Sequence, residues 1–244
     1  MAFGELCLGN IAQQIQTLEA QIITTAHACG RTPKDIQLLA VSKGQSVTAI
    51  REAYAMLLTH FGESYVQEAR EKMQLLSDLA IIWHFIGTIQ RNKTKFIAEN
   101  FSWVHSISRL DIAQRLQEAR PKSLLPLNVC IQVNLDKDTG KSGASPAEVI
   151  SLANHIIPLT RLRLRGLMAI PKPLSNPVEQ YDYFSRLKQL QTTVSDALNH
   201  PLDTLSMGMS HDWPAAIRAG STLLRLGQCI FGKRHNKNSW ETRT

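Results

Sequence analysis

The sequence contains few cysteines, few aromatic residues and no long apolar run. Its four cysteines are scattered along the 244 residues, with no CxxC pair and no histidine–cysteine cluster at metal-ligand spacing: Cys7, Cys29, Cys130 and Cys229. No apolar run approaches the ~18 residues of a membrane span, and the first residues, MAFGELCLGN, lack the pattern of a secretory signal. These absences argue against a disulfide scaffold, a zinc site and a membrane protein. We therefore expect a cytoplasmic protein with reduced thiols and no metal site.

Basic residues outnumber acidic ones without forming a stretch typical of nucleic-acid binding. The sequence has 27 Lys and Arg against 20 Asp and Glu, a formal net charge of +7. The last stretch, GKRHNKNSWETRT, is basic and polar, but no basic run with interleaved aromatic residues occurs. We interpret residues 236–244 as a disordered tail and expect no nucleic-acid partner; a nucleic-acid-binding module that uses this tail is the alternative. A modest positive balance also suits a protein whose ligands carry phosphate.

Strand-like and helix-like runs alternate along the chain. An amphipathic helix is predicted for residues 8–30, and it ends at Gly30. Eight runs rich in Leu, Ile and Val follow, alternating with helix-like runs: 36–43, 59–64, 81–87, 102–108, 127–135, 162–170, 204–210 and 223–232. This alternation predicts a single (β/α)8 TIM barrel domain over residues 1–235, with an extra N-terminal helix. A doubly wound open sheet fits less well, because SKGQSV after the first strand is not a glycine-rich fingerprint.

The carboxyl ends of the predicted strands carry the candidate site, because barrel active sites lie there. Lys43 ends the first strand, where a desolvated amine is costly unless something compensates it. Phosphate sites in barrels use the loops after strands seven and eight, which here contain Ser210, Asp212 and Gly227. An amine beside a phosphate site suggests a phosphorylated aldehyde ligand such as pyridoxal 5′-phosphate (PLP), with Arg225 adding positive potential. A class I aldolase, or a lysine that only pairs with phosphate, is left open.

Other residues give weaker signals. LDKDTGKS resembles a phosphate-binding P-loop only at its end, because the first glycine of that motif is Leu135 here. His84 lies between Trp83 and Phe85 and is interpreted as a hydrogen-bonded core residue and not as a base. All four tyrosines fall in helix-like stretches and are interpreted as packing residues: Tyr54, Tyr65, Tyr181 and Tyr183.

Several long motifs together resemble one known family. LLAVSK, FGESYVQEAREK, WHFIGTIQRNK, GLMAIP and LSMGMSHDWPAAIRAGSTLLRLGQCIFG are similar, in this order, to the pyridoxal-phosphate homeostasis protein family (YggS/PROSC-like). The resemblance covers nearly the whole chain. It implies a single (β/α)8 barrel similar to the cofactor domain of alanine racemase, with PLP held as a Schiff base, a covalent aldimine, on Lys43.

The resemblance also implies roles for other residues. Arg225 would face the pyridine nitrogen and keep it unprotonated, because a guanidinium stays charged. Ser210 and the backbone of Gly227 and Gln228 would hold the phosphate, joined by Ser206. Ser64 belongs to the cofactor-binding set but replaces the asparagine usual in the family, and Gln228 replaces a threonine. SKGQS also departs from the more frequent SKT form beside Lys43.

A carrier of PLP is expected instead of an enzyme. Racemisation of the alanine-racemase type needs a tyrosine from a further C-terminal domain, and the chain ends just after the eighth predicted strand. No tyrosine lies at a predicted strand end. The resemblance implies a protein of intracellular PLP homeostasis without catalytic turnover, with PLP-requiring apo-enzymes as candidate recipients. A one-domain, PLP-dependent racemase-like enzyme that uses His84 or a water as acid/base is the alternative.

Overall fold

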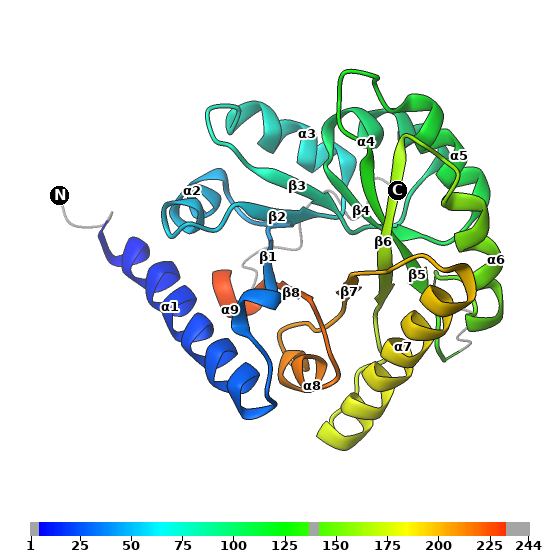
Figure 1. Cartoon of the computed structure of the whole chain (residues 1–244). Helices are drawn as coiled ribbons and strands as arrows, with labels where there is room; N and C mark the ends of the chain where they lie inside the picture. The colour runs from blue at the N-terminus through cyan, green and yellow to red at the C-terminus, as the bar shows by residue number, and fades with distance from the viewer. Residues whose placement is uncertain (1–4, 137–141, 233–244) are drawn as a thin grey trace.

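The chain folds into a closed barrel of eight parallel strands. The structure, a computed structural model, describes residues 5–136 and 142–232. The strands pair in chain order, and β1 pairs with β8 to close the barrel (Figure 1). Their bounds are β1 (Gln37–Val41), β2 (His60–Glu63), β3 (Ile82–Phe85), β4 (Trp103–Ile107), β5 (Leu127–Val133), β6 (Leu162–Ala169), β7 (Thr204–Ser206) and β8 (Leu223–Leu226). The predicted (β/α)8 barrel is confirmed.

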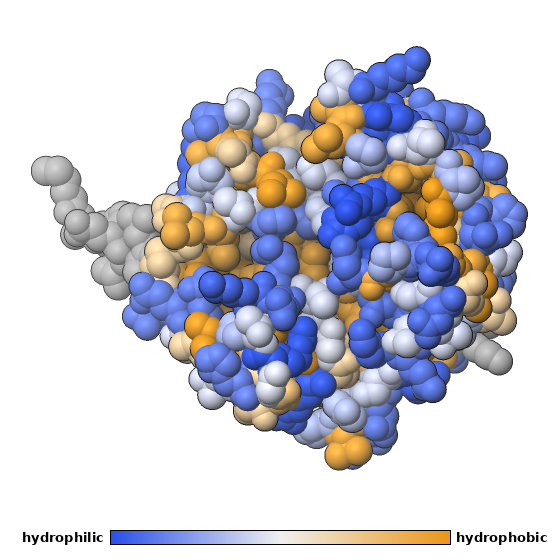
Figure 2. Space-filling model, in the orientation of Figure 1, coloured by the Kyte–Doolittle hydropathy of each residue, from blue (hydrophilic) through white to orange (hydrophobic). Residues whose placement is uncertain are grey.

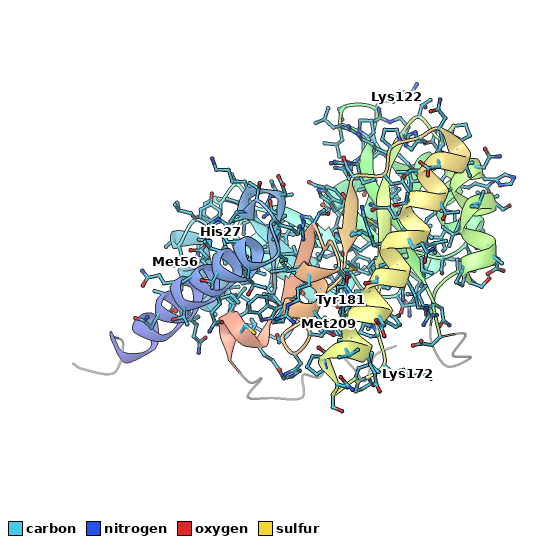
Figure 3. All side chains as sticks on the ribbon, turned by 60° about the horizontal axis from the view of Figure 1, so that its bottom comes forward. His27, Met56, Lys122, Lys172, Tyr181 and Met209 are labelled. Atoms are coloured by element: carbon cyan, nitrogen blue, oxygen red, sulfur yellow. The ribbon has the colours of Figure 1, made fainter. Side chains whose placement is uncertain are left out.

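Helices surround the barrel between successive strands (Figure 1). They are α2 (Val47–Ala55), α3 (Val66–Leu75), α4 (Thr94–Asn100), α5 (Leu110–Ala119), α6 (Pro146–Ile156), α7 (Pro177–Leu198), α8 (Trp213–Arg218) and the short α9 (Gln228–Phe231). The loop with Lys122 precedes β5 and the loop with Lys172 follows β6, so these two labelled residues mark the amino and carboxyl ends of the barrel in Figure 3. The candidate site predicted from the sequence lies at the carboxyl end.

The extra N-terminal helix is present as α1 (Glu5–Ala28). It lies on the outside of the barrel against α2, α8 and α9 (Figure 1). Ile15, Leu18, Ile22 and Ala26 are buried, at the three- and four-residue steps that place side chains on one face of a helix. Burial of this apolar face attaches α1 to the barrel.

The last two strands are shorter than predicted. β7 ends at Ser206 and β8 ends at Leu226, whereas the predicted runs extend to residues 210 and 232. After β7 the chain turns at Gly208, which has a positive φ of 94° and where an added Cβ would lie 2.7 Å from the Cβ of Ala216. After β8 the chain passes through Gly227 into α9. The loops expected to hold phosphate therefore begin deeper in the barrel than the hydrophobic pattern indicates.

Polar and apolar side chains are mixed over the face of the molecule in Figure 2. Within the described ranges, no helix combines the length and the apolar character needed to cross a membrane. The same ranges contain no group of three His, Cys, Asp or Glu residues that could hold a metal ion. The predicted tail, residues 236–244, lies outside the described residues.

Candidate functional site

Lys43 lines a cavity at the carboxyl end of the barrel. The cavity has a volume of about 640 Å3, and residues that follow β1, β2, β3 and β6 surround it together with one residue each of β3 and β5. Its lining is Lys43, Ser64, Tyr65, Val66, Gln67, Phe85, Ile86, Gly87, Thr88, Gln90, Lys93, Gln132 and Ile170. Two amines and no carboxylate belong to this set, so the cavity favours an anionic ligand. The structure thus brings Lys43 and Ser64 into one site.

Tyr65 corrects the prediction that every tyrosine packs within a helix. Helix α3 begins at Val66, and Tyr65 precedes it with an extended backbone, φ −122° and ψ 125°. Tyr65 therefore follows β2 by two residues and lines the cavity that Lys43 also lines. The helix-like pattern that begins at Tyr65 hid this position, because helix ends are uncertain by one or two residues. Tyr65 consequently belongs to the residues around the candidate site.

Arg225 is buried inside the barrel on β8 and is held by three hydrogen bonds. Its NH1 group donates to the backbone oxygen of Ser206 at 2.5 Å and to the Ser206 hydroxyl at 2.8 Å, and its NH2 group donates to the oxygen of Ala169 at 2.9 Å. Burial lowers the pKa of Arg225 to about 10. The guanidinium is therefore both charged at neutral pH and fixed in orientation.

A row of three histidines, of which His60 is half-buried and the other two are buried, leads to this arginine. Nδ1 of His60 lies 2.9 Å from Nε2 of His84, Nδ1 of His84 lies 2.9 Å from Nε2 of His105, and Nδ1 of His105 lies 2.7 Å from the Ser206 hydroxyl. Burial lowers the pKa of all three, that of His105 to about 3 with help from Arg225. The interpretation of His84 as a hydrogen-bonded core residue is confirmed.

The available donors set the direction of the hydrogen bonds along these histidines. Arg225 donates to Ser206 Oγ, so the hydroxyl proton can be given to Nδ1 of His105. A neutral histidine that accepts a hydrogen bond at Nδ1 donates one from Nε2. His105 therefore donates to Nδ1 of His84, and His84 in turn donates to Nδ1 of His60. Ser206 is completely buried, and its hydroxyl helps to fix Arg225 by accepting a hydrogen bond from the guanidinium.

The remaining predicted residues lie in the loops after β7 and β8. Cys229 Sγ donates to the oxygen of Ser210 at 3.6 Å, so the loop with Ser210 lies beside Gln228 and Cys229 of α9. A Cβ added at Gly227 would lie 3.1 Å from the oxygen of Val41, two residues before Lys43. The loops after β7 and β8 are thus next to the end of β1. None of the five residues Ser206, Ser210, Arg225, Gly227 and Gln228 belongs to the lining of the 640 Å3 cavity.

The sequence placed Glu63 at the end of a predicted strand but did not show that three ionisable groups form a buried network beside Lys43. Lys72 Nζ donates to Glu63 Oε1 at 2.8 Å and to Glu68 Oε1 at 2.6 Å. Burial, more than the nearby charges, raises the pKa of Glu63 to about 7. The four-residue spacing of Glu68 and Lys72 was visible in the sequence, but that spacing is common on solvated helix faces.

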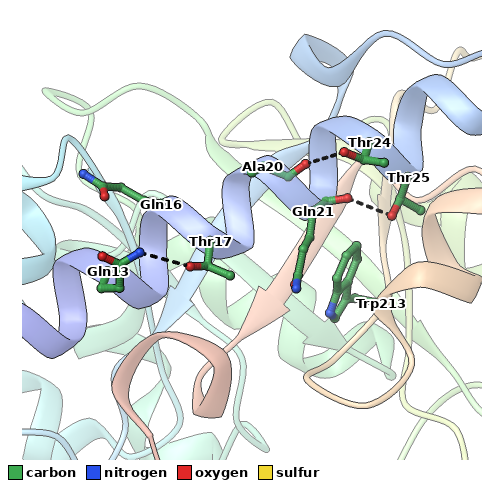
Figure 4. A pocket seen from close by; sticks show the side chains of 8 residues that line it. All are labelled: Gln13, Gln16, Thr17, Ala20, Gln21, Thr24, Thr25 and Trp213. Carbon is green, nitrogen blue, oxygen red and sulfur yellow. Dashed lines mark hydrogen bonds between the residues drawn. The ribbon is translucent and has the colours of Figure 1, made fainter.

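A second groove lies outside the barrel between α1 and α8. Its volume is about 780 Å3, and Figure 4 shows its lining of glutamines and threonines beside one indole: Gln13, Gln16, Thr17, Ala20, Gln21, Thr24, Thr25 and Trp213. The Thr24 and Thr25 hydroxyls donate to carbonyls of their own helix, those of Ala20 and Gln21. No amine or carboxylate belongs to this lining, so it offers no chemistry comparable to that around Lys43.

Comparison with known proteins identifies the family. The family model described as alanine racemase, N-terminal domain, matches residues 14–235. A Pseudomonas aeruginosa PAO1 protein named pyridoxal phosphate homeostasis protein is 51% identical over 227 residues, which are 93% of this chain and 97% of that protein. This chain belongs to the pyridoxal phosphate homeostasis protein family. An Escherichia coli K12 protein of the same name is 45% identical over 230 residues, 93% of this chain and 98% of that protein.

Solved structures agree with the family and the fold. PipY of Synechococcus elongatus PCC7942, in a structure described as having PLP bound, is 35% identical with a TM-score of 0.82, over 91% of this chain and 100% of PipY. Alanine racemase of Clostridium difficile 630 is 15% identical with a TM-score of 0.68, over 92% of this chain and 59% of that enzyme. The second likeness concerns the barrel alone.

Proposed function

We propose that this protein binds PLP through a Schiff base between Lys43 and the aldehyde carbon of the cofactor. The observation that carries the proposal is the position of Lys43 in the wall of a 640 Å3 cavity at the carboxyl end of β1. A buried, charged guanidinium at Arg225 and a glycine that brings backbone close to β1 fit the ring nitrogen and the phosphate of PLP. The amine of Lys43 would attack the aldehyde carbon of PLP, and the aldehyde oxygen would leave as water as the C=N bond forms.

The residues around Lys43 have separate roles in this proposal. Ser210 and the backbone of Gly227 and Gln228 bind the phosphate. Arg225 donates to the pyridine nitrogen and keeps it unprotonated, so the ring withdraws electrons weakly. Ser206, which contacts Arg225, takes part by holding that guanidinium. Ser64 lines the cavity beside Lys43 and contacts the cofactor there.

We further propose that the protein carries and releases PLP in the cytoplasm and does not turn over amino acids. The names of the curated relatives favour homeostasis over catalysis. PLP-requiring apo-enzymes are the proposed recipients. A one-domain racemase-like enzyme is the second candidate, because Tyr65 places a phenol in the cavity of Lys43, where an acid/base partner would be needed.

The test is an absorption spectrum of the pure protein mixed with PLP. The wild type is expected to show a Schiff-base band that borohydride traps on a Lys43 peptide. Lys43→Ala is expected to show the spectrum of free PLP. Lys93→Ala is the matched control, since it removes the other amine of the same cavity and should keep the band.

Two outcomes would contradict parts of the proposal. A wild-type spectrum equal to that of free PLP would refute covalent binding at Lys43. Interconversion of the enantiomers of an amino acid, measured by chiral chromatography and lost in Tyr65→Phe, would favour the racemase-like enzyme over the carrier.

A further inference from the structure

The backbone on both sides of Lys43 is held by side chains of α3. Lys72 Nζ donates to the oxygen of Ser42 at 2.7 Å, and Glu68 Oε1 accepts from the backbone N–H of Gly44 at 2.6 Å. Gly44 has a positive φ of 72°, so the chain turns immediately after Lys43. Lys43 is thus the central residue of a three-residue segment that is bound at both ends.

The two side chains that hold this segment are themselves joined. Glu68 and Lys72 form an ion pair at 2.6 Å, one helical turn apart on α3. Lys72 also reaches Glu63 Oε1 at 2.8 Å, and the Ser42 hydroxyl donates to the same oxygen at 2.6 Å. The ends of β1 and β2 are therefore connected with helix α3, from Glu68 in its first turn to Lys72 in its last, by one hydrogen-bonded network.

Burying this network costs free energy, because its charged groups lose their contact with water. Apolar side chains could fill the same space without that cost. The side chains of Glu63, Glu68 and Lys72 are 0%, 6% and 6% exposed, and Glu63 Oε2 has no hydrogen-bond partner. Replacing a buried ion pair with apolar residues of similar size is often neutral or stabilising. Charges kept in such a place are better explained by what they hold, which here is the segment from Ser42 to Gly44.

We propose that Glu68 and Lys72 are positioning residues for Lys43, which clamp the backbone of residues 42–44 so that the amine is directed toward the cavity. The inference rests on the proposed function, since it concerns capture of the PLP aldehyde by Lys43. A clamped backbone removes conformations of Lys43 in which the amine cannot reach the ligand. A displacement of about 1 Å in a reacting group can slow a reaction by about 100-fold.

The main test compares two ligands on one disabling variant. Glu68→Leu/Lys72→Met removes both charges and keeps apolar volume in their place. We expect Schiff-base formation with PLP, followed by stopped-flow absorbance, to slow by at least about tenfold. Pyridoxine 5′-phosphate has an alcohol instead of the aldehyde. Its affinity for the variant should stay within twofold of that for wild type, because Glu68 and Lys72 hold residues 42–44 and not the loops after β7 and β8.

Two further variants separate positioning from general damage. Glu68→Gln keeps an acceptor for the Gly44 N–H, and it should restore PLP capture to near the wild-type rate. Arg51→Met/Asp78→Asn removes an exposed ion pair of 2.7 Å between α2 and the turn after α3, and it should leave both ligands unaffected. Equal losses for PLP and pyridoxine 5′-phosphate, or PLP capture unchanged in the disabling variant, would overturn the proposal.

A measurement without ligand keeps the clamp testable if the disabling variant does not fold or if PLP does not bind. In the wild type the Gly44 amide should resist hydrogen exchange as strongly as the amides of β1. Exchange at the rate of an open loop would overturn the clamp. Failure of the wild type to form a Schiff base would instead refute the proposed function, and the Gly44 amide would still decide whether the clamp exists.

Discussion

The charge state of Glu63 gives the sharpest quantitative prediction. This carboxyl group is fully buried with Glu68 and one ammonium, that of Lys72. Two carboxylates and one ammonium leave a net negative charge in a dry site unless one carboxyl group keeps its proton. Burial first, and then the charge of Glu68, raise the pKa of Glu63 from 4.5 to about 7, against the opposing effect of Lys72.

The sign of the effect on stability follows from proton binding. Between pH 4.5 and about 7 the folded protein keeps a proton that the unfolded chain has released, so the free energy of unfolding falls as the pH rises. At about 1.4 kcal/mol per unit, the whole change amounts to about 3 kcal/mol. It is complete once the pH exceeds the folded pKa.

The perturbation is Glu63→Gln, which imitates the protonated carboxyl group at every pH. Urea unfolding at pH 5, 6, 7 and 8 measures the free energy of unfolding of both proteins. The value for the variant should exceed that of wild type by less than about 1 kcal/mol at pH 5 and by about 3 kcal/mol at pH 8. Glu99→Gln on the exposed side of α4 is the control, and its difference from wild type should stay within about 0.5 kcal/mol throughout. A Glu63→Gln difference that does not change with pH would show that Glu63 is ionised in the folded protein, and the charge argument would be wrong.

Three further predictions concern the residues around Arg225 and the loop after β8. Gly227→Ala puts a Cβ 3.1 Å from the oxygen of Val41, so PLP affinity measured by fluorescence titration should fall by about tenfold while the fold is kept. Ser206→Ala removes the hydroxyl shared by Arg225 and His105, and thermal unfolding should reveal a loss of about 1–3 kcal/mol. The pKa of His105 is lowered to about 3, so 15N NMR at pH 5 should show a neutral ring protonated at Nε2; a protonated, cationic ring would contradict the assigned polarity.

Much of the fold and one key residue could be predicted from local sequence patterns. Alternating apolar runs and amphipathic helices are local features, and eight such units can close into a barrel. Lys43 was recognisable because it follows a buried strand, and strand ends gather at one edge of a parallel barrel. The cavity around Lys43 and Ser64 agrees with that reasoning.

Other parts of the site depended on contacts between distant residues. Tyr65 lines the cavity because α3 begins one residue later than its hydrophobic pattern indicates. His105 and Ser206 are 101 positions apart, and their hydrogen bond forms because the closed barrel brings side chains of β4 and β7 together in its interior. No local pattern distinguishes such a histidine from one on the surface.

The sequence by itself determined where strands and helices form and which residues end the strands, because periodicity and turn residues act over a few neighbours. Only the tertiary structure decided which strand ends share a cavity and which ionisable groups are taken out of water. Glu68 and Lys72 have the spacing of an ordinary surface pair, yet burial turns them into the groups that hold Lys43. Desolvation and hydrogen bonding depend on distances in space, and those are set when the barrel closes.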